Sequence, residues 1–218
     1  MQTTDRWRFD PLGEAAVLAT YAETDMDAAN RAAVALAEAI TRAALPGVGA
    51  VVPAIDTVLV AFDPLHISRA EVEGVLRALT AIPPSAESTG RDVVIAVRFG
   101  GAEGPDLPEV AATLGLSETG VIQTLCERPI RVLMVGYAPG WPYLGPLPAA
   151  LTLPRRATPR AAIPPGSVAI AAGMAGIYPA RLPGGWHLIG RTDALMFDPS
   201  RETPSLLRAG DRVRFQPA

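Results

Sequence analysis

The stretch from Gly136 to Gly190 sets the architecture of this chain: it begins GYAPGWPYLGPLP (136–148), continues PRRATPRAAIPPGSVAIAAG (154–173) and ends GIYPARLPGGWHLIG (176–190). These 55 residues contain 10 prolines and 9 glycines. Proline fixes φ and glycine permits positive φ, so the stretch favours turns and short strands over helices. Trp, Tyr, Ile and Val between the turns indicate a packed segment, since disordered chains are poor in such residues.

Further short strands on both sides of this stretch predict a second domain over residues 89–218. Residues 93–97 form an uninterrupted apolar run, which is typical of a buried strand. Short helices are expected at 106–114 and 117–127, with Gly115 ending the first and Ser117 capping the second. The remaining expected strands cover 131–137, 167–171, 176–179, 186–189, 195–197 and 212–215. Many short strands separated by turn residues are typical of a β-barrel or sandwich.

Residues 1–88 are expected to form a small α/β domain of the ferredoxin-like kind. The expected elements are a strand at 14–21, a helix from Thr24 or Asp25 to residue 44, strands at 48–52 and 57–62, and a helix at 68–81. This β-α-β-β-α order lacks only the last strand of the split βαβ arrangement. Residues 92–99 either supply that closing strand or open the second domain. The Pro/Ser/Gly-rich segment 83–90 marks the boundary.

The composition excludes several classes of protein. Of the 218 residues, 49% are hydrophobic and 19% charged, as in globular proteins. No apolar run reaches the roughly 18 residues of a membrane-spanning helix, and no secretory signal is visible, so we expect a cytoplasmic protein without membrane contacts. A single cysteine, Cys126, excludes an intramolecular disulfide, and two histidines are too few for a typical zinc site. All 19 basic residues are arginine, which excludes mechanisms that need a lysine.

Charge is distributed unevenly along the chain. Residues 1–127 hold 18 acidic residues and 8 arginines, whereas residues 128–218 hold 4 acidic residues and 11 arginines. A basic region attracts an anionic ligand, and it equally binds the acidic half of its own chain or of a neighbour. Nucleic acid is not expected as a partner, because the pI is about 5.4 and no arginine cluster is interleaved with aromatic residues.

Two local patterns in the proline- and glycine-rich stretch carry candidate binding groups. Residues 136–145 place aromatic side chains directly after a strand, beside backbone that glycine and proline shape. Residues 154–160 hold arginines in a proline frame, and guanidinium groups bind carboxylate or phosphate through paired hydrogen bonds. Each pattern also has a structural explanation: a tight corner filled by aromatic rings, and arginines that satisfy loop carbonyl groups.

From Gly136 to Pro199 the chain closely resembles the KipI family, also called allophanate hydrolase subunit 1, carboxyltransferase subdomain C/D, or the 5-oxoprolinase B-subunit. The matching motifs are the three quoted above, together with the closing GDRVRF (210–215). Weaker matches upstream, including Asn30 and GPDL (104–107), extend the resemblance over nearly the whole chain.

The resemblance implies a fold, partners and an activity. The fold is a small α/β domain followed by a cyclophilin-like β-barrel. The partners are a KipA-type subunit with a related barrel (the 5-oxoprolinase C-subunit, or allophanate hydrolase subunit 2) and a third, metal-containing subunit. Together they perform the ATP-dependent opening of 5-oxoproline or act on a related allophanate or urea-type substrate. The alternative is a KipI-like regulatory protein that inhibits a histidine kinase by direct binding.

Two positions depart from the pattern of many family members. This chain has Leu125 where many have histidine, and Met174 where many have glutamine. If those residues serve the chemistry, this chain has a changed substrate or a lost activity. If Leu125 and Met174 are repacked core, nothing functional follows.

The resemblance and the residue chemistry together point to a site for an activated amide or lactam. Catalytic candidates are His187, whose ordinary pKa is close to neutrality, with Arg160 and Ser167. A lone histidine also has a structural explanation. A Ser/His/Asp triad can be written from Ser167, His187 and Asp193, but any chain of this size offers such a trio. The substrate- and anion-binding candidates are Arg155, Arg191, Thr192, Tyr143, Tyr178 and Trp186.

ATP is the expected cofactor, with magnesium. The stretch between Glu127 and Asp193 holds no carboxylate, so the partner is expected to supply the magnesium ligands, and no metal site is expected in this chain.

Overall fold

The structure is a computed structural model, and it describes residues 6–81 and 90–218. These residues form two compact units, an N-terminal unit before the 82–89 segment and a C-terminal unit after it. The boundary expected at residues 88 and 89 lies outside the described residues. None of the helices in the described ranges is long and apolar enough to cross a membrane.

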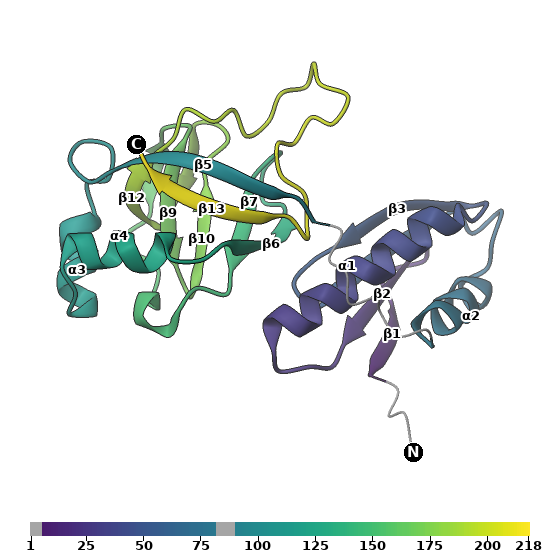
Figure 1. The fold of residues 1–218 in the computed structure, drawn as a ribbon. Helices are drawn as coiled ribbons and strands as arrows, with labels where there is room; N and C mark the ends of the chain where they lie inside the picture. The colour runs from purple at the N-terminus through teal and green to yellow at the C-terminus, as the bar shows by residue number, and fades with distance from the viewer. Residues whose placement is uncertain (1–5, 82–89) are drawn as a thin grey trace. The chain divides into compact units, whose positions relative to one another are not determined.

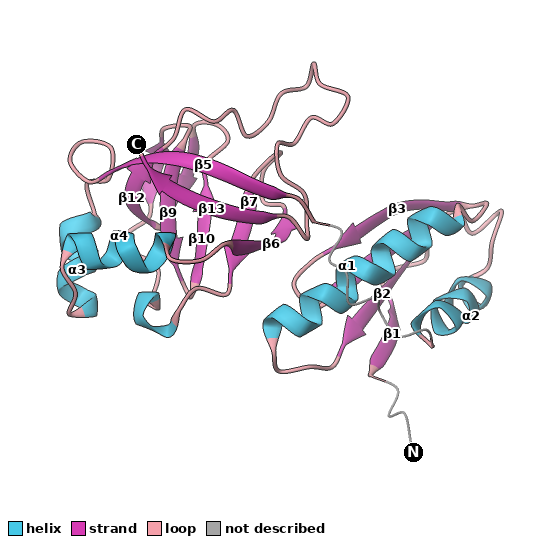
Figure 2. Cartoon of the chain, in the orientation of Figure 1, coloured by secondary structure: helices cyan, strands magenta, loops and turns pink. Residues whose placement is uncertain are grey.

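The N-terminal unit is a four-stranded antiparallel sheet with two helices on one face (Figure 2). In chain order it contains β1 Trp7–Pro11, β2 Ala16–Tyr21, α1 Met26–Ala43, β3 Val48–Pro53, β4 Thr57–Phe62 and α2 Arg69–Thr80. The sheet order is β1-β2-β4-β3. Alternate residues of β4 are buried against helix side chains spaced three and four apart, which is the pattern that places helices on a single face.

Side-chain caps begin both helices of this unit where the sequence predicts them. The Asp25 carboxylate accepts hydrogen bonds from the N–H groups of Asp27 and Ala28. Ser68 and Glu71 form a capping box, in which each side chain bonds the other residue's backbone N–H.

The edge strand of this sheet comes from the N-terminus, not from the segment after α2. Strand β1 pairs antiparallel with β2 and takes the place that the closing strand has in a ferredoxin-like sheet. Residues 92–99 instead open the C-terminal unit, which was the second of the two expectations for them. Strand β1 was not expected from the sequence, although Trp7 and Phe9 alternate with Arg8 and the two aromatic side chains pack against the unit's core.

The C-terminal unit is a closed seven-stranded barrel (Figure 1), which confirms the expected β-barrel. Its strands are β5 Asp92–Phe99, β6 Ile130–Val135, β7 Pro142–Gly145, β9 Ser167–Ala171, β10 Met174–Ile177, β12 His187–Arg191 and β13 Arg212–Pro217. They are ordered β10-β7-β6-β13-β5-β12-β9, with β5 and β13 parallel. Helices α3 Leu107–Leu114 and α4 Glu118–Cys126 pack on each other and on the barrel, and η1 Ala149–Leu151 is a single 3-10 turn. Strands β8 Arg160–Ile163 and β11 Leu182–Gly184 form a separate two-stranded sheet.

The barrel wall is buried on both faces along β9. Val168 and Ile170 belong to the large core inside the barrel, whereas Ala169 and Ala171 belong to a smaller core outside it. The smaller core also contains Ile163 of β8, so the β8–β11 sheet covers this part of the wall.

Three strands that sequence reasoning missed, β7, β8 and β11, surround this second core. Proline inside β7 and β11 argues against a strand in sequence-based reasoning, because it cannot donate to a ladder.

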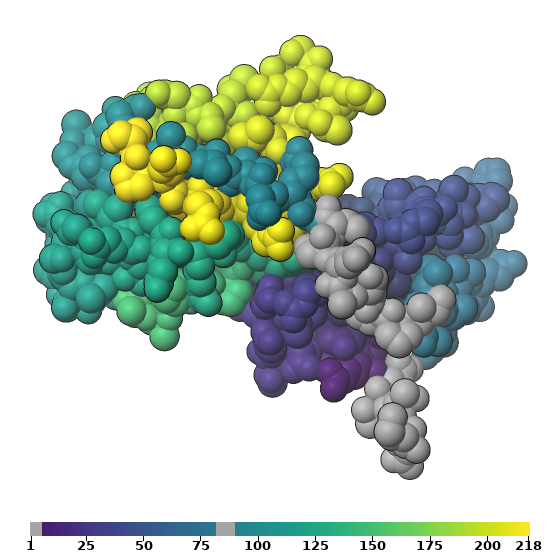
Figure 3. Space-filling model, viewed as in Figure 1, coloured from purple at the N-terminus to yellow at the C-terminus, as the bar shows by residue number. Residues whose placement is uncertain are grey.

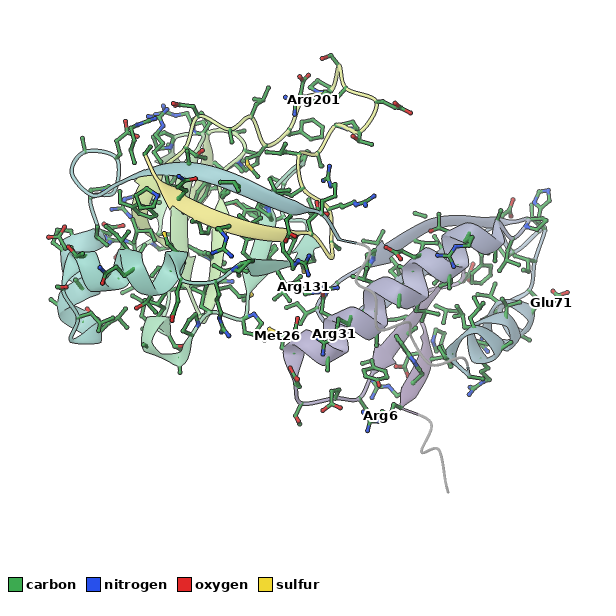
Figure 4. The ribbon with its side chains drawn as sticks, viewed as in Figure 1. Arg6, Met26, Arg31, Glu71, Arg131 and Arg201 are labelled. Atoms are coloured by element: carbon green, nitrogen blue, oxygen red, sulfur yellow. The ribbon has the colours of Figure 1, made fainter. Side chains whose placement is uncertain are left out.

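The segment between β12 and β13 projects from the barrel as an irregular arm (Figures 1 and 3), and Arg201 lies on it (Figure 4). The strand expected at 195–197 is wrong: the arm has only an isolated bridge between Phe197 and Ser205. Leu195 is exposed, whereas its neighbour Met196 is buried in the large core, so this apolar run packs without forming a strand. The base of the arm packs closely on Gly140, where a Cβ would lie 2.7 Å from the Cβ of Phe197.

A buried carboxylate joins the start of the barrel to its last strand. Asp211 is fully buried and accepts hydrogen bonds from Arg91 N–H at 2.9 Å, from Arg91 Nη2 at 2.6 Å and from Arg208 N–H at 3.1 Å. Burial opposes ionisation, but these hydrogen bonds outweigh it and lower the pKa of Asp211 below its ordinary value.

We predict that Asp211→Ala lowers the free energy of unfolding of the C-terminal unit by about 3 kcal/mol, because it leaves buried donors without an acceptor. Asp92→Ala is the matched control, since Asp92 pairs with Arg212 at 2.8 Å on an exposed surface and should cost less than about 1 kcal/mol. Urea unfolding of both variants measures the difference. Equal losses would contradict the role given to Asp211.

Candidate functional site

Five aromatic rings gather on the outer face of the barrel, and we call them the aromatic cluster: Tyr137, Trp141, Tyr143, Tyr178 and Trp186. The Trp141 ring is central. Its centroid lies 4.3 Å from that of Tyr178, 5.5 Å from Trp186, 5.7 Å from Tyr137 and 6.0 Å from Tyr143. All four contacts are edge-to-face, which is a favoured geometry for aromatic pairs.

Glycines make the room in which two of these rings lie. A Cβ at Gly176 would be 2.5 Å from Cζ2 of Trp141, and a Cβ at Gly184 would be 2.0 Å from the Tyr178 hydroxyl. Neither separation is compatible with a side chain at the glycine unless the ring moves. The glycines of the GIY and PGGW motifs are therefore explained by close approach of aromatic rings to the backbone.

The cluster runs from the core to the surface. Tyr178 and Trp141 are 1% and 2% exposed, Tyr143 is partly buried, and Tyr137 is 59% exposed. Tyr137 has a φ of 70°, a left-handed conformation that few non-glycine residues adopt. Its hydroxyl donates a hydrogen bond to the carbonyl oxygen of Pro183 at 2.9 Å, so the turn before β7 is tied to β11.

A buried carboxylate, Asp106, fixes the arginine segment beside the cluster. Arg160 donates to both of its oxygens, from Nη1 to Oδ2 at 2.9 Å and from Nη2 to Oδ1 at 2.7 Å. Arg156 Nη1 donates to Oδ1 at 3.2 Å, and the backbone N–H of Leu188 donates to Oδ2 at 2.7 Å. Asp106 thus connects α3, the 154–160 segment and β12, which are far apart in the sequence.

The charge state of Asp106 follows from these contacts. Burial opposes ionisation, but the hydrogen bonds from Arg160 and Leu188 and the positive charges of Arg160 and Arg156 outweigh it. The pKa of this carboxyl therefore lies below its ordinary value, and the group is ionised at neutral pH.

The tyrosine hydroxyls and Arg155 act on one another electrostatically. Burial raises the pKa of Tyr178 to about 12, and the Tyr137 hydroxyl adds to the rise, while Arg160 and Arg155 oppose it. Burial also raises the pKa of Tyr143, which Arg155 opposes and Tyr137 reinforces. Both phenols are therefore protonated at neutral pH and available as hydrogen-bond donors.

Unpartnered polar atoms concentrate around this cluster. Across residues 6–81 and 90–218, the buried side-chain polar atoms without a hydrogen-bond partner are Glu103 Oε2, Trp141 Nε1, Arg156 Nε and His187 Nδ1. Trp141 belongs to the cluster, Arg156 binds Asp106, and His187 follows Trp186 on β12. Buried polar groups normally have partners, so three orphans near one surface mark it as a candidate binding site.

The structure brings together five of the predicted site residues: Arg155, Arg160, Tyr143, Tyr178 and Trp186. The imidazole of His187 lies close to this set, with Nε2 3.0 Å from the carbonyl oxygen of Pro154. Because a carbonyl oxygen can only accept, Nε2 is the nitrogen that donates this hydrogen bond.

The other three predicted residues lie together at the far end of β12. Ser167 pairs with Arg191 across the β9–β12 ladder, and the Thr192 N–H donates to Gly166. The Thr192 hydroxyl accepts from the N–H of Ala194 at 3.1 Å, and Arg191 Nε lies 4.0 Å from Glu103.

A Ser167–His187–Asp193 triad does not form. His187 pairs with Ile170 on the ladder, not with Ser167, and the Asp193 carboxylate is held by Arg98 through hydrogen bonds of 2.7 and 2.9 Å.

Sequence reasoning missed Asp106, Trp141 and Tyr137. Asp106 lies well before the carboxylate-free stretch 128–192 in the chain, and only folding places it beside Arg156 and Arg160. Its position before an expected helix and within GPDL was the available indication. Trp141 lies inside the first aromatic motif, but its central position depends on contacts with residues up to 45 positions away.

The two departures from the family pattern lie in different environments. Leu125 is fully buried in the core inside the barrel, so it is packed core. Met174 is partly buried and packs against the core outside the barrel, on the same side as the aromatic cluster.

The fold and the aromatic cluster together define the class of protein. It is a two-unit α+β protein whose closed barrel carries aromatic and arginine side chains on its outer wall. Residues 7–207 match the family described as carboxyltransferase domain, subdomain C and D, and the chain belongs to this family. This confirms the resemblance found in the sequence.

Three similar proteins illustrate the relationship. The chain is 35% identical to the 5-oxoprolinase B-subunit of Bacillus subtilis, over 97% of this chain and 93% of that protein. It is 50% identical to the 5-oxoprolinase B-subunit of Escherichia coli O157:H7, over 60% of each protein. Among solved structures it is similar to TTHA0988, with a TM-score of 0.82 and 42% identity. That match covers 93% of this chain and 39% of TTHA0988.

We predict that Gly184→Ala lowers the free energy of unfolding by about 1–3 kcal/mol, because the new methyl group displaces the buried Tyr178 ring. Gly185→Ala is the matched control: the nearest atom to a Cβ there is Pro159 Cγ at 3.6 Å, an ordinary contact. Urea unfolding with near-ultraviolet circular dichroism follows stability and aromatic packing together. A Gly184→Ala protein as stable as the control would contradict the packing described.

The lowered pKa of Asp106 gives a prediction for acid stability. A carboxyl with a folded pKa below its unfolded value stabilises fully above the unfolded pKa, and this stabilisation is lost as pH falls through the folded pKa. The difference in free energy of unfolding between wild type and Asp106→Asn should therefore shrink between pH 7 and about pH 3. Urea unfolding of both proteins across this range measures it; a difference that stays constant would show that Asp106 is not the titrating group.

Proposed function

We propose that this chain is a subunit of an ATP-dependent hydrolase that opens a cyclic amide of the 5-oxoproline type. It acts with a KipA-type subunit that has a related barrel and with a third, metal-containing subunit. Family membership and the 35% identity to a 5-oxoprolinase B-subunit over 97% of this chain support the proposal. The chain spans 60% of the length of the Escherichia coli relative, so the activity of the whole assembly is part of what is proposed.

The observation that carries the proposal is the aromatic cluster with Arg155 beside it. A lactam ring is small, planar and partly apolar, and the edges and faces of Tyr143 and Trp186 offer it a matching surface. Protonated phenols donate hydrogen bonds to a carbonyl oxygen, and such donors stabilise the negative charge that develops there when the amide is attacked. The guanidinium group of Arg155 provides the positive charge for an anionic substituent.

ATP enters this proposal as the reactant that drives ring opening. The buried carboxylate that binds the arginine segment beside the cluster is Asp106, and its oxygens are occupied by Arg156, Arg160 and the Leu188 N–H. This set does not fit a magnesium ion, which needs free carboxylate oxygens. In the part of the chain that the structure describes, no group of three or more His, Cys, Asp or Glu residues is placed to hold a metal ion. We assign the magnesium ligands to the partner and derive no step of the reaction through the ion.

The regulatory alternative requires an exposed apolar surface for a kinase. The large hydrophobic residues exposed in the described ranges are Leu12, Val52, Leu65, Val94, Tyr137 and Leu195, which come from six separate segments. The aromatic and arginine cluster is the feature built for a small molecule, and it favours the enzyme subunit.

We predict ADP release that requires this chain, the partner subunits and 5-oxoproline together. Tyr143→Phe should lower kcat/KM for the lactam by about 10-fold or more, because it removes a donor to the carbonyl. Tyr21→Phe in the N-terminal unit is the matched control and should leave kcat/KM unchanged.

A stable, fully assembled complex that releases no ADP with 5-oxoproline would contradict the proposed substrate. An allophanate or urea-type substrate, or the regulatory role, would then be tested next.

A further inference from the structure

Trp141 carries a hydrogen-bond donor for which the protein supplies no acceptor. The residue is 2% exposed, and its Nε1 is among the buried side-chain polar atoms without a partner in residues 6–81 and 90–218. Burying an indole N–H without an acceptor is unfavourable, so the group needs an explanation, and an acceptor on a bound molecule is one. Because Trp141 is almost fully buried, a molecule from solvent reaches this donor only when a neighbouring ring moves.

Of the four rings that contact Trp141, Tyr137 is the one that can move at least cost. Tyr178 and Trp186 are 1% and 5% exposed, and Tyr143 belongs to β7, where it is paired with β10. Tyr137 is 59% exposed and lies in the turn before β7, outside any strand. Rotation of the Tyr137 ring therefore removes one contact from Trp141 without disturbing the core or the barrel ladder.

The backbone of this turn is held in place, so the moving part is the side chain. The N–H of Gly136 donates to the carbonyl oxygen of Trp141 at 3.1 Å, and the N–H of Trp141 donates to that of Ala138 at 3.0 Å. The left-handed φ of Tyr137, 70°, is a conformation that non-glycine residues adopt at a cost. With this backbone the Tyr137 hydroxyl reaches the carbonyl oxygen of Pro183 at 2.9 Å, and this hydrogen bond has to break before the ring rotates.

We propose that Tyr137 is a latch over the aromatic cluster, closed in this structure by its hydrogen bond to Pro183. When the ring rotates away, Trp141 Nε1 becomes accessible and donates a hydrogen bond to an acceptor oxygen of the bound molecule. The cluster thus has a closed state and an open state, and only the open state binds.

Exchange of the Trp141 indole N–H with solvent, followed by NMR on the full chain, measures opening of the latch. Tyr137→Phe keeps the ring and removes the hydroxyl, so the open state is populated more often. We expect the exchange rate at Trp141 to rise about 5-fold, as loss of one hydrogen bond predicts. The indole signal of Trp7 in the N-terminal unit is the internal control, and Tyr21→Phe, also in that unit, should leave the Trp141 rate unchanged.

Affinity for 5-oxoproline distinguishes a latch from a residue that contacts the bound molecule. The choice of this probe rests on the proposed function, whereas the latch itself does not. If only the open state binds, Tyr137→Phe raises the fraction of competent chains and should tighten binding by up to about 5-fold in calorimetric titration. A hydroxyl that contacts the bound molecule would give the opposite sign. At saturation the Trp141 indole signal should shift and its exchange should slow, because the N–H then has an acceptor.

Each outcome bears on the latch or on the substrate. Equal exchange at Trp141 in wild type and Tyr137→Phe overturns the latch and assigns the buried N–H to the face of a neighbouring ring. Weaker 5-oxoproline binding in Tyr137→Phe, or an indole signal that stays unchanged at saturation, also overturns the proposal. Faster exchange in Tyr137→Phe, with no 5-oxoproline binding to either protein, supports the latch and contradicts the proposed substrate.

Discussion

The buried carboxylate of Asp106 is the interaction on which the C-terminal unit's functional surface depends. It lies at the start of α3 and receives hydrogen bonds from Arg160, Arg156 and the backbone of Leu188. A buried carboxylate is stable only when its hydrogen-bonding capacity is met, so it fixes the three segments that meet it. The proline-framed arginine segment is thereby held against β12, and the side chain of Arg155 is left on the exposed side.

A second constraint is the use of one barrel wall for two cores. Strand β9 contributes Val168 and Ile170 to the inside and Ala169 and Ala171 to the outside. The small alanine side chains leave room for Trp141 and Tyr178, and Gly176 and Gly184 leave room for ring atoms against the backbone. The wall therefore accepts large aromatic side chains where an ordinary barrel faces water. Because these rings are fixed by packing, their hydroxyls and indole nitrogen are held in place before any ligand arrives.

Elements with a local cause were predictable from the sequence. Both helices of the N-terminal unit start at capping residues, Asp25 and Ser68, because a cap is a contact between neighbours in the chain. Strand β9 matches its expected range because its apolar run is continuous. Strands β7, β8 and β11 were missed because each has only three or four residues, and β1 was missed although its partner β2 follows it directly in the chain. The strand expected at 195–197 failed because an apolar run there has no ladder to join.

The family, the β-rich second domain, and the aromatic and arginine residue types that build the site can all be read from the amino-acid sequence alone. Arg155 and Arg160 are equivalent at that level, since both lie in the same motif and neither has a nearby carboxylate in the chain. Folding separates them, by placing Asp106 against Arg160 and leaving Arg155 unpaired within the described residues. The physical reason is that a charge is available to a ligand only where no other group has neutralised it, and the neutralising group here is 54 positions away in the sequence.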